Sequence, residues 1–130
     1  MEDRYLFKAK DCNSIWRAGL LIALQEDRCA IEEKDGSKWA CDSETLCQCT
    51  GLKDKNGKLI WENDVVNCLT EKCCGCIGWN ESEAGFYFNV LLEDGRFEEE
   101  YIYDYQDGIE VIGNVFDDPE LLESEVGNDK

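Results

Sequence analysis

Histidine is absent from this 130-residue chain, and proline and methionine occur once each. Without histidine, no Ser–His or Cys–His pair can activate a nucleophile, and no imidazole can bind a metal ion. Basic residues are also scarce, since 13 lysines and arginines face 30 acidic residues and leave a formal charge of −17. That charge repels the phosphate backbone of nucleic acids, so we expect no direct nucleic-acid binding.

Long apolar runs are missing as well. No stretch approaches the roughly 18 consecutive apolar residues that a membrane helix needs. The first residues, MEDRYLFKAKD, carry charges where a secretory signal would have its apolar core. Both features predict a cytoplasmic protein that does not enter a membrane.

Short apolar segments separated by polar turn residues make up most of the chain. Their spacing predicts an antiparallel sheet or small barrel, with enough apolar residues for one compact domain. The segment 16–24 is also compatible with a helix, and Gly19 within it predicts a bulge or a close crossing of strands. Short helical turns are expected at Asp42 to Thr45 and after Asp118. The expected strands cover residues 4–9, 16–24, 29–33, 59–66, 77–79, 86–92, 97–105 and 109–116.

The segment Thr50 to Val66, TGLKDKNGKLIWENDVV, contains the strongest short-range signal. Its Asn56–Gly57 pair predicts a type I′ hairpin turn, because both central residues of that turn need a positive φ, which these residue types tolerate best. Lys55 and Lys58 then lie at a hairpin tip. No glycine-rich phosphate-binding loop leads into a helix here.

Two carboxylates, Glu62 and Asp64, follow in the same segment. In a strand, residues two apart share one face, so both carboxylates would point the same way. Such a pair can bind a hard cation or divide acid and base roles. A polar face at a strand entry explains the pattern equally simply, and both interpretations stay open.

Nine cysteines occur in a chain for which we expect no export, so reduced thiols are predicted. Cys47 and Cys49 form one tight group, and Cys73 and Cys76 belong to a second, and four such thiolates can complete a tetrahedral zinc site. The spacing of these cysteines is irregular for a zinc site. Buried cysteine often serves as a small apolar filler, and we prefer this interpretation to metal binding or to a redox-labile cluster. A reactive thiol would need a neighbouring cation, and Lys72 beside Cys73 is the candidate.

Three ordered blocks of the sequence resemble the YopX family of proteins, which bacteriophages and prophages encode. The first block resembles the family's early strand with its internal glycine, the second its central signature and the third its closing motif. They are WRAGLL at Trp16 to Leu21, KWACDSETLCQCTGLKDKNGKLIWENDVV at Lys38 to Val66, and IEVIGNVFDDPELL at Ile109 to Leu122.

The resemblance implies a mainly β protein whose residues 51–115 form an SH3-like small barrel, with additional N-terminal β-strands and a short C-terminal helical turn. It implies a single domain over residues 1–122 and a flexible acidic tail at 123–130. No catalytic, cofactor-binding or metal-binding residues follow from it, because the family has no agreed activity. Asn63 stands where the family usually has glycine, which is tolerable since asparagine visits left-handed conformations. Cys49 replaces a large apolar residue, so the cysteine excess is not a family trait.

These observations favour a non-enzymatic accessory protein that binds a host or phage protein in the bacterial cytoplasm, with homo-oligomer formation also open. The first alternative is a metal-dependent enzyme that uses carboxylates such as Glu62 and Asp64. The second is an acidic mimic of nucleic acid, in which a row of carboxylates lines one face at the spacing of phosphates. The residues of that row would include Glu98, Glu99, Glu100, Asp104 and Asp107.

Overall fold

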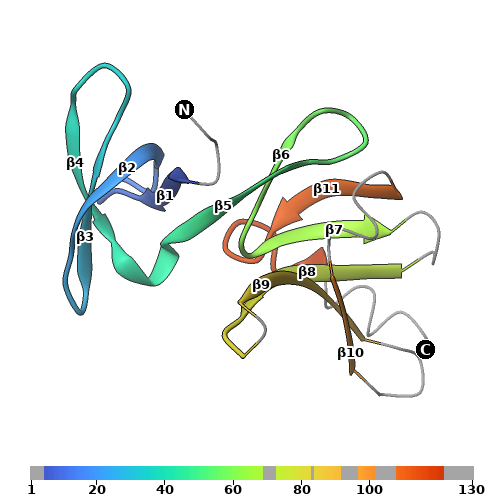
Figure 1. Ribbon diagram of the computed structural model, residues 1–130. Coiled ribbons are helices and arrows are strands. Elements are labelled where there is room, and N and C mark those ends of the chain that lie inside the picture. Colours follow the sequence, from blue (N-terminus) through green and yellow to red (C-terminus); the bar gives the residue numbers. More distant parts are fainter. Residues whose placement is uncertain (1–4, 69–72, 83, 92–96, 102–107, 122–130) are drawn as a thin grey trace. The chain divides into compact units, whose positions relative to one another are not determined.

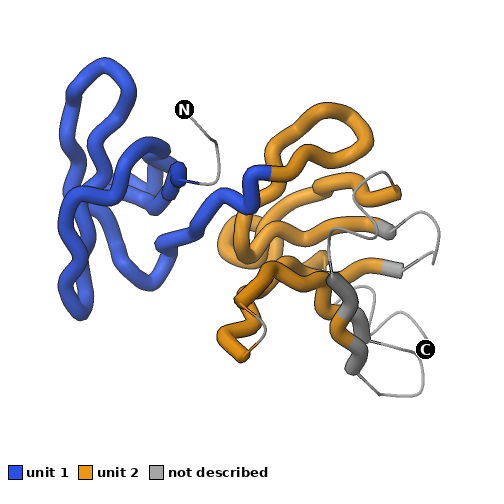
Figure 2. The backbone as a smooth tube through the Cα atoms, viewed as in Figure 1, with its two compact units in different colours: residues 1–51 blue, residues 52–130 orange. Residues whose placement is uncertain are grey.

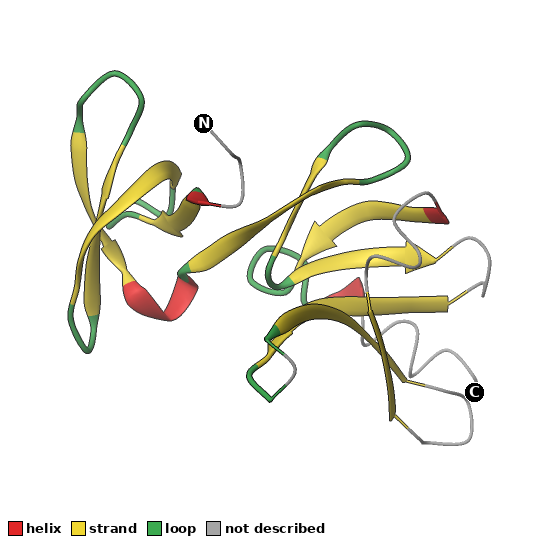
Figure 3. Cartoon of the chain, in the orientation of Figure 1, coloured by secondary structure: helices red, strands yellow, loops and turns green. Residues whose placement is uncertain are grey.

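A computed structural model describes the chain except for residues 1–4, 69–72, 83, 92–96, 102–107 and 122–130 (Figure 1). The chain divides into two compact units, residues 1–51 and 52–130 (Figure 2). Strands make up most of the described chain (Figure 3), which confirms the predicted mainly β class. The tail predicted at 123–130 lies outside the described residues.

The first unit is built on an antiparallel sheet in which β1 lies between β2 and β5. Apolar residues alternate along the strands, so Cys29 and Ile31 of β3 are buried with Ala9 of β1 and Cys41 of β4. A bridge between Asp11 and Cys41 also joins the end of β1 to β4. The elements are β1 (Phe7–Lys10), β2 (Trp16–Leu24), β3 (Arg28–Glu32), β4 (Lys38–Asp42), the 3-10 turn η2 (Ser43–Thr45) and β5 (Cys47–Lys53).

The segment 16–24 is a strand with the predicted bounds, and Gly19 packs closely against the end of β3. A Cβ atom at position 19 would overlap the carbonyl oxygen of Glu32 and lie 2.8 Å from its carbonyl carbon. The crossing predicted at this glycine is therefore confirmed. The irregularity in pairing with β3 lies further along, between Leu21 and Ala23.

The turn expected at Asp42 to Thr45 is also present. The Asp42 carboxylate accepts a hydrogen bond of 2.9 Å from the backbone N–H of Glu44 and caps η2. The helical turn expected after Asp118 is not established. Leu121 donates its backbone N–H to the Asp118 carbonyl at 3.0 Å, but the residues that would continue the turn are outside the described part.

The second unit holds a five-stranded antiparallel sheet in the order β10-β9-β8-β7-β11, and β6, which pairs with β5. Its core consists of Ile60, Val66, Ile77, Phe86, Phe88 and Ile109. The strands are β6 (Leu59–Trp61), β7 (Asp64–Cys68), β8 (Cys73–Asn80), β9 (Gly85–Leu91), β10 (Phe97–Tyr101) and β11 (Ile109–Asn114).

The hairpin tip at Asn56–Gly57 differs from the predicted type I′ turn. Only Gly57 has a positive φ, of 83°, and Asn56 does not. Asp54 donates its N–H to the Lys58 carbonyl at 2.8 Å, which leaves a three-residue loop, and Gly57 donates to the Asp54 carbonyl at 3.0 Å. This is the hairpin in which a type I turn is followed by one left-handed residue. The hairpin prediction holds, but the turn type was wrong.

The same backbone arrangement occurs twice in the first unit. Asp11 donates to the Ile15 carbonyl at 3.0 Å, and Glu33 donates to the Ser37 carbonyl at 2.8 Å. The last residue of each three-residue loop again has a positive φ, 63° at Ser14 and 92° at Gly36. Three hairpins of this chain therefore share one loop geometry.

Replacing Gly57 with valine is expected to destabilise the protein by on the order of 1–3 kcal/mol, because a β-branched residue is strained at positive φ. Nothing lies within 4 Å of the Cβ position, so the cost comes from the backbone and not from a clash. Gly57→Asn is the matched control, since asparagine tolerates this conformation. Equal denaturation midpoints for the two variants would contradict the left-handed conformation assigned to Gly57.

Candidate functional site

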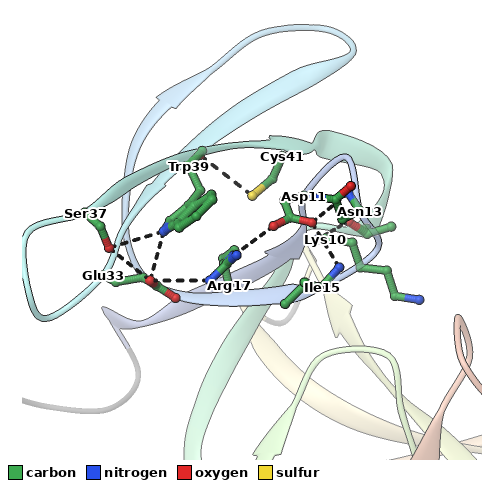
Figure 4. A network of polar contacts seen from close by, with 10 residues as sticks. Lys10, Asp11, Asn13, Ile15, Arg17, Glu33, Ser37, Trp39 and Cys41 are labelled. Carbon is green, nitrogen blue, oxygen red and sulfur yellow. Dashed lines mark hydrogen bonds and ion pairs between the residues drawn. The ribbon is translucent and has the colours of Figure 1, made fainter.

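A network of polar side chains joins three strands of the first unit around Arg17 of β2 (Figure 4). Arg17 donates its Nε–H to the Asp11 carboxylate at 2.9 Å, and its guanidinium carbon lies 3.5 Å from the centre of the Trp39 ring. The indole N–H of Trp39 donates to Glu33 at 2.9 Å. The Ser37 hydroxyl donates to the same Glu33 oxygen at 3.1 Å.

Asp11 is the most deeply buried acid of this network. Its Oδ1 atom accepts the backbone N–H groups of Asn13 at 2.8 Å and Ile15 at 3.0 Å, while Oδ2 faces Arg17. The hydrogen bond from Ile15 is the main reason that the pKa of Asp11 is lowered, and Arg17 and Asn13 lower it further against the effect of burial. Asp11 is thus held as a carboxylate, and its oxygens serve to fix the loop and the arginine.

Asp54 performs a comparable task in the second unit. Its Oδ1 atom accepts the backbone N–H groups of Asn56 and Lys58, each at 2.9 Å, and its Oδ2 atom accepts that of Val111 at 2.9 Å. Burial alone would raise the pKa of Asp54, but these backbone hydrogen bonds outweigh burial and the pKa is lowered. One carboxylate therefore closes the hairpin and fastens it to β11.

Glu62 and Asp64 are not a pair on one face of a strand, as the carboxylate hypothesis required. Glu62 and Asn63 form the turn between β6 and β7, and Asn63 has the expected positive φ, of 72°. Asp64 is buried, and its Oδ2 atom accepts the Trp61 backbone N–H at 2.8 Å. Glu62 therefore belongs to the turn and Asp64 to the start of β7.

The four cysteines considered as zinc ligands are divided between the units, with Cys47 and Cys49 in the first and Cys73 and Cys76 in the second. Cys47 and Cys49 are both buried, as residues two apart on a strand should be when one face is covered. In the part of the chain that the structure describes, no three Cys, Asp or Glu side chains are grouped to hold a metal ion. Lys72 is outside that part.

The described cysteines differ in their exposure to solvent. Cys12 is exposed, whereas Cys29 and Cys41 are register partners on β3 and β4 and are buried. Burial, followed by the neighbouring Cys29, raises the pKa of Cys41 to about 11. Burial and the charge of Asp42 also raise the pKa of Cys29.

A thiol reagent is therefore expected to modify Cys12 quickly in the native protein and to reach Cys29 and Cys41 only on unfolding, because the thiolate is the reactive form. Alkylation for increasing times, followed by peptide mass spectrometry, measures this order. A Cys12→Ser variant should lose the fast phase. Fast labelling of Cys41 in the native state would contradict this order of labelling.

Exposed apolar side chains lie along β2, a feature that the sequence pattern of an apolar strand did not indicate. Leu20, Ile22 and Leu24 are 40%, 45% and 60% exposed, and we call these three the β2 patch. Ile15, just before the strand, is 48% exposed. The pairing of β2 with β3 is irregular between Leu21 and Ala23, and Leu20 is the register partner of Glu32 while Leu24 is that of Cys29. The β2 patch therefore follows the strand and is not confined to one face of the sheet.

Of the acids proposed as a nucleic-acid mimic, Glu98, Glu99 and Glu100 are consecutive residues of β10. Glu99 is exposed and accepts a hydrogen bond of 3.2 Å from Asn80. Asp104 and Asp107 lie outside the described residues.

The two units define a mainly β protein whose buried acids hold hairpins together and whose β2 strand presents apolar side chains. The model of the family described as YopX protein matches residues 6–123. The chain therefore belongs to the YopX family, as its three blocks suggested. No curated protein matches it significantly. No helix in the described ranges is long and apolar enough to cross a membrane.

Proposed function

We propose that this chain is a phage or prophage accessory protein that acts in the bacterial cytoplasm by binding a host or phage protein, without catalysing a reaction. The β2 patch is the observation that carries the proposal. Several exposed apolar side chains along one strand of a small domain are a feature of interaction sites. Membership of the YopX family adds support for the phage or prophage origin.

The surroundings of the β2 patch suit a protein partner. Trp16 begins the same strand, and Lys8 and Lys10 of β1 place their ammonium groups 4.7 and 5.4 Å from the centre of its ring. Aromatic anchors beside apolar residues and a polar rim are the usual composition of a protein interface. The buried acids, in contrast, are engaged with backbone N–H groups, as described for Asp11 and Asp54.

Capture from a lysate of the bacterial host, with quantitative mass spectrometry, tests the proposal. The full chain is expected to retain a specific protein that an Ile22→Asp variant loses. Ile112→Asp is the matched control, because Ile112 is 39% exposed but belongs to β11. An unchanged set of captured proteins with Ile22→Asp, or none above background with the parent chain, would count against it. Light scattering on the purified chain reports whether the partner is a second copy.

We also propose that residues 51–115 form an SH3-like small barrel followed by a short helical turn. The consecutive antiparallel strands β7 to β10, with β11 returning beside β7, support this architecture. Backbone hydrogen bonds that close the sheet on itself, detected by NMR, are the expected evidence. If these closing hydrogen bonds are absent, the sheet is open and the barrel proposal is wrong.

A further inference from the structure

The Asn56–Gly57 pair at the tip of the third hairpin combines an exposed amide with a following residue that has no side chain. Nothing lies within 4 Å of the Cβ position of Gly57, so the tip is open on that side. An asparagine followed by glycine is the sequence in which the backbone nitrogen can most easily attack the side-chain amide carbon, because no Cβ obstructs the approach. Asparagine is for this reason among the chemically labile residues.

We propose that Asn56 is a site of spontaneous deamidation whose rate is set by opening of the hairpin tip and whose product weakens the attachment of β11. In the first step the Gly57 nitrogen bonds to Cγ of Asn56, the Cγ–Nδ2 bond breaks, and the displaced proton leaves with ammonia. Water then opens the cyclic imide to give aspartate or isoaspartate. The net reaction consumes one water and releases one ammonia, with no oxidant or reductant.

Two hydrogen bonds hold the reacting atoms in the folded hairpin. The Gly57 N–H, whose nitrogen is the nucleophile, donates to the Asp54 carbonyl at 3.0 Å. The leaving Nδ2 group of Asn56 donates to Oε2 of Glu110 on β11 at 3.3 Å. Both bonds must break before the nitrogen can reach Cγ, so the reaction proceeds from a locally opened tip.

The product changes the charge where the hairpin meets β11. An aspartate at position 56 places a carboxylate against Glu110, where the amide had donated a hydrogen bond, and like charges at this distance repel. An isoaspartate also lengthens the backbone inside the loop that the Asp54–Lys58 hydrogen bond closes. Either product draws the loop away from Asp54, whose Oδ2 atom holds the Val111 N–H.

Asn13 supplies an internal control. It is exposed and lies in a loop with the same hydrogen bonds, since the Asp11 carboxylate accepts its N–H as the Asp54 carboxylate accepts that of Asn56. The next residue there is Ser14, whose side chain hinders attack by its own nitrogen. The loop hydrogen bonds are therefore matched between the two sites, whereas the following residue and the Glu110 contact differ.

The test is incubation of the full chain at neutral pH, with peptide mass spectrometry and isoaspartate labelling over time. Deamidation is expected at Asn56 ahead of Asn13, more slowly in the folded chain than in denaturant. Glu110→Ala should accelerate it in the folded chain only, whereas Glu110→Gln, which keeps an acceptor, should not. Gly57→Ala should slow it in denaturant.

The consequence for β11 is measured on an Asn56→Asp variant, which carries one of the two products. Hydrogen exchange of the Val111 amide is expected to be faster than in the parent chain, while exchange in the first unit stays the same. Equal folded and unfolded rates at Asn56, faster reaction at Asn13, or an unchanged Val111 amide in Asn56→Asp would each overturn the proposal.

Discussion

Replacing Asp54 with alanine is expected to lower the free energy of unfolding by on the order of 3 kcal/mol. The carboxylate is buried and accepts the backbone N–H groups of Asn56, Lys58 and Val111. Hydrogen bonds to a charged group stabilise more than neutral ones, and N–H groups left without an acceptor in a buried place add to the loss. Replacing an exposed aspartate usually changes the free energy of unfolding by much less.

Denaturant unfolding of the parent, Asp54→Ala and Asp54→Asn chains measures the effect. Asparagine keeps one acceptor oxygen, so its cost should be smaller than that of alanine. Asp35→Ala is the matched control, because Asp35 is exposed and accepts the backbone N–H of Ser37 within a loop of the same geometry. Equal losses for Asp54→Ala and Asp35→Ala would contradict the role given to Asp54.

The pH dependence follows from the direction of the pKa shift. The pKa of Asp54 is lower in the folded chain than in the unfolded chain, where it is about 3.9. Its stabilising contribution is therefore fully present above that value and is lost as the pH falls through the lower, folded pKa. The Asp54→Asn variant should lose less stability than the parent chain on acidification.

Introducing a single methyl group at Gly19 is expected to destabilise the first unit by about 3 kcal/mol. The Cβ atom of alanine would meet the backbone of Glu32, with its carbonyl carbon at 2.8 Å, and the Cα of Glu33 at 3.1 Å. These are backbone atoms of a paired strand, so β2 and β3 would have to separate. A flexible side chain would move aside at a smaller cost.

Gly36→Ala separates this effect from a general loss of glycine. Gly36 has a φ of 92° and nothing within 4 Å of its Cβ position, so alanine there costs about 1 kcal/mol of backbone strain without a clash. Thermal unfolding followed by circular dichroism gives both values. If the two variants melt together, the close approach at Gly19 does not control stability.

Several elements were predicted correctly from local patterns, since their causes are also local. A run of apolar residues predicted β2, the Asp42 side chain caps η2, and Asn63 has the positive φ expected of it. The type I′ turn was wrong because the Asn–Gly pair does not fix the loop length. Asp54, two residues earlier, offers an acceptor to two N–H groups of a longer loop.

The roles of the buried acids could be read only in part. A pattern such as DCNSI or DKNGK is consistent with an aspartate that accepts N–H groups from its own loop. The partners Arg17 and Val111 are set by strand pairing and by contacts far along the chain, which no local pattern specifies. The exposure of Leu20 and Ile22 likewise depends on how β3 pairs with β2, which no local pattern specifies.

The carboxylate of Asp54 makes contacts of very different sequence separation, and this difference bears on the order of folding. The N–H groups of Asn56 and Lys58 are two and four residues away, whereas that of Val111 is 57 residues away. Short loops close before long ones because their closure costs less chain entropy. We therefore expect the Oδ1 hydrogen bonds within the hairpin to form early in folding and the Oδ2 hydrogen bond to Val111 to form late. Loss of the Val111 hydrogen bond alone should then speed unfolding and leave the folding rate nearly unchanged.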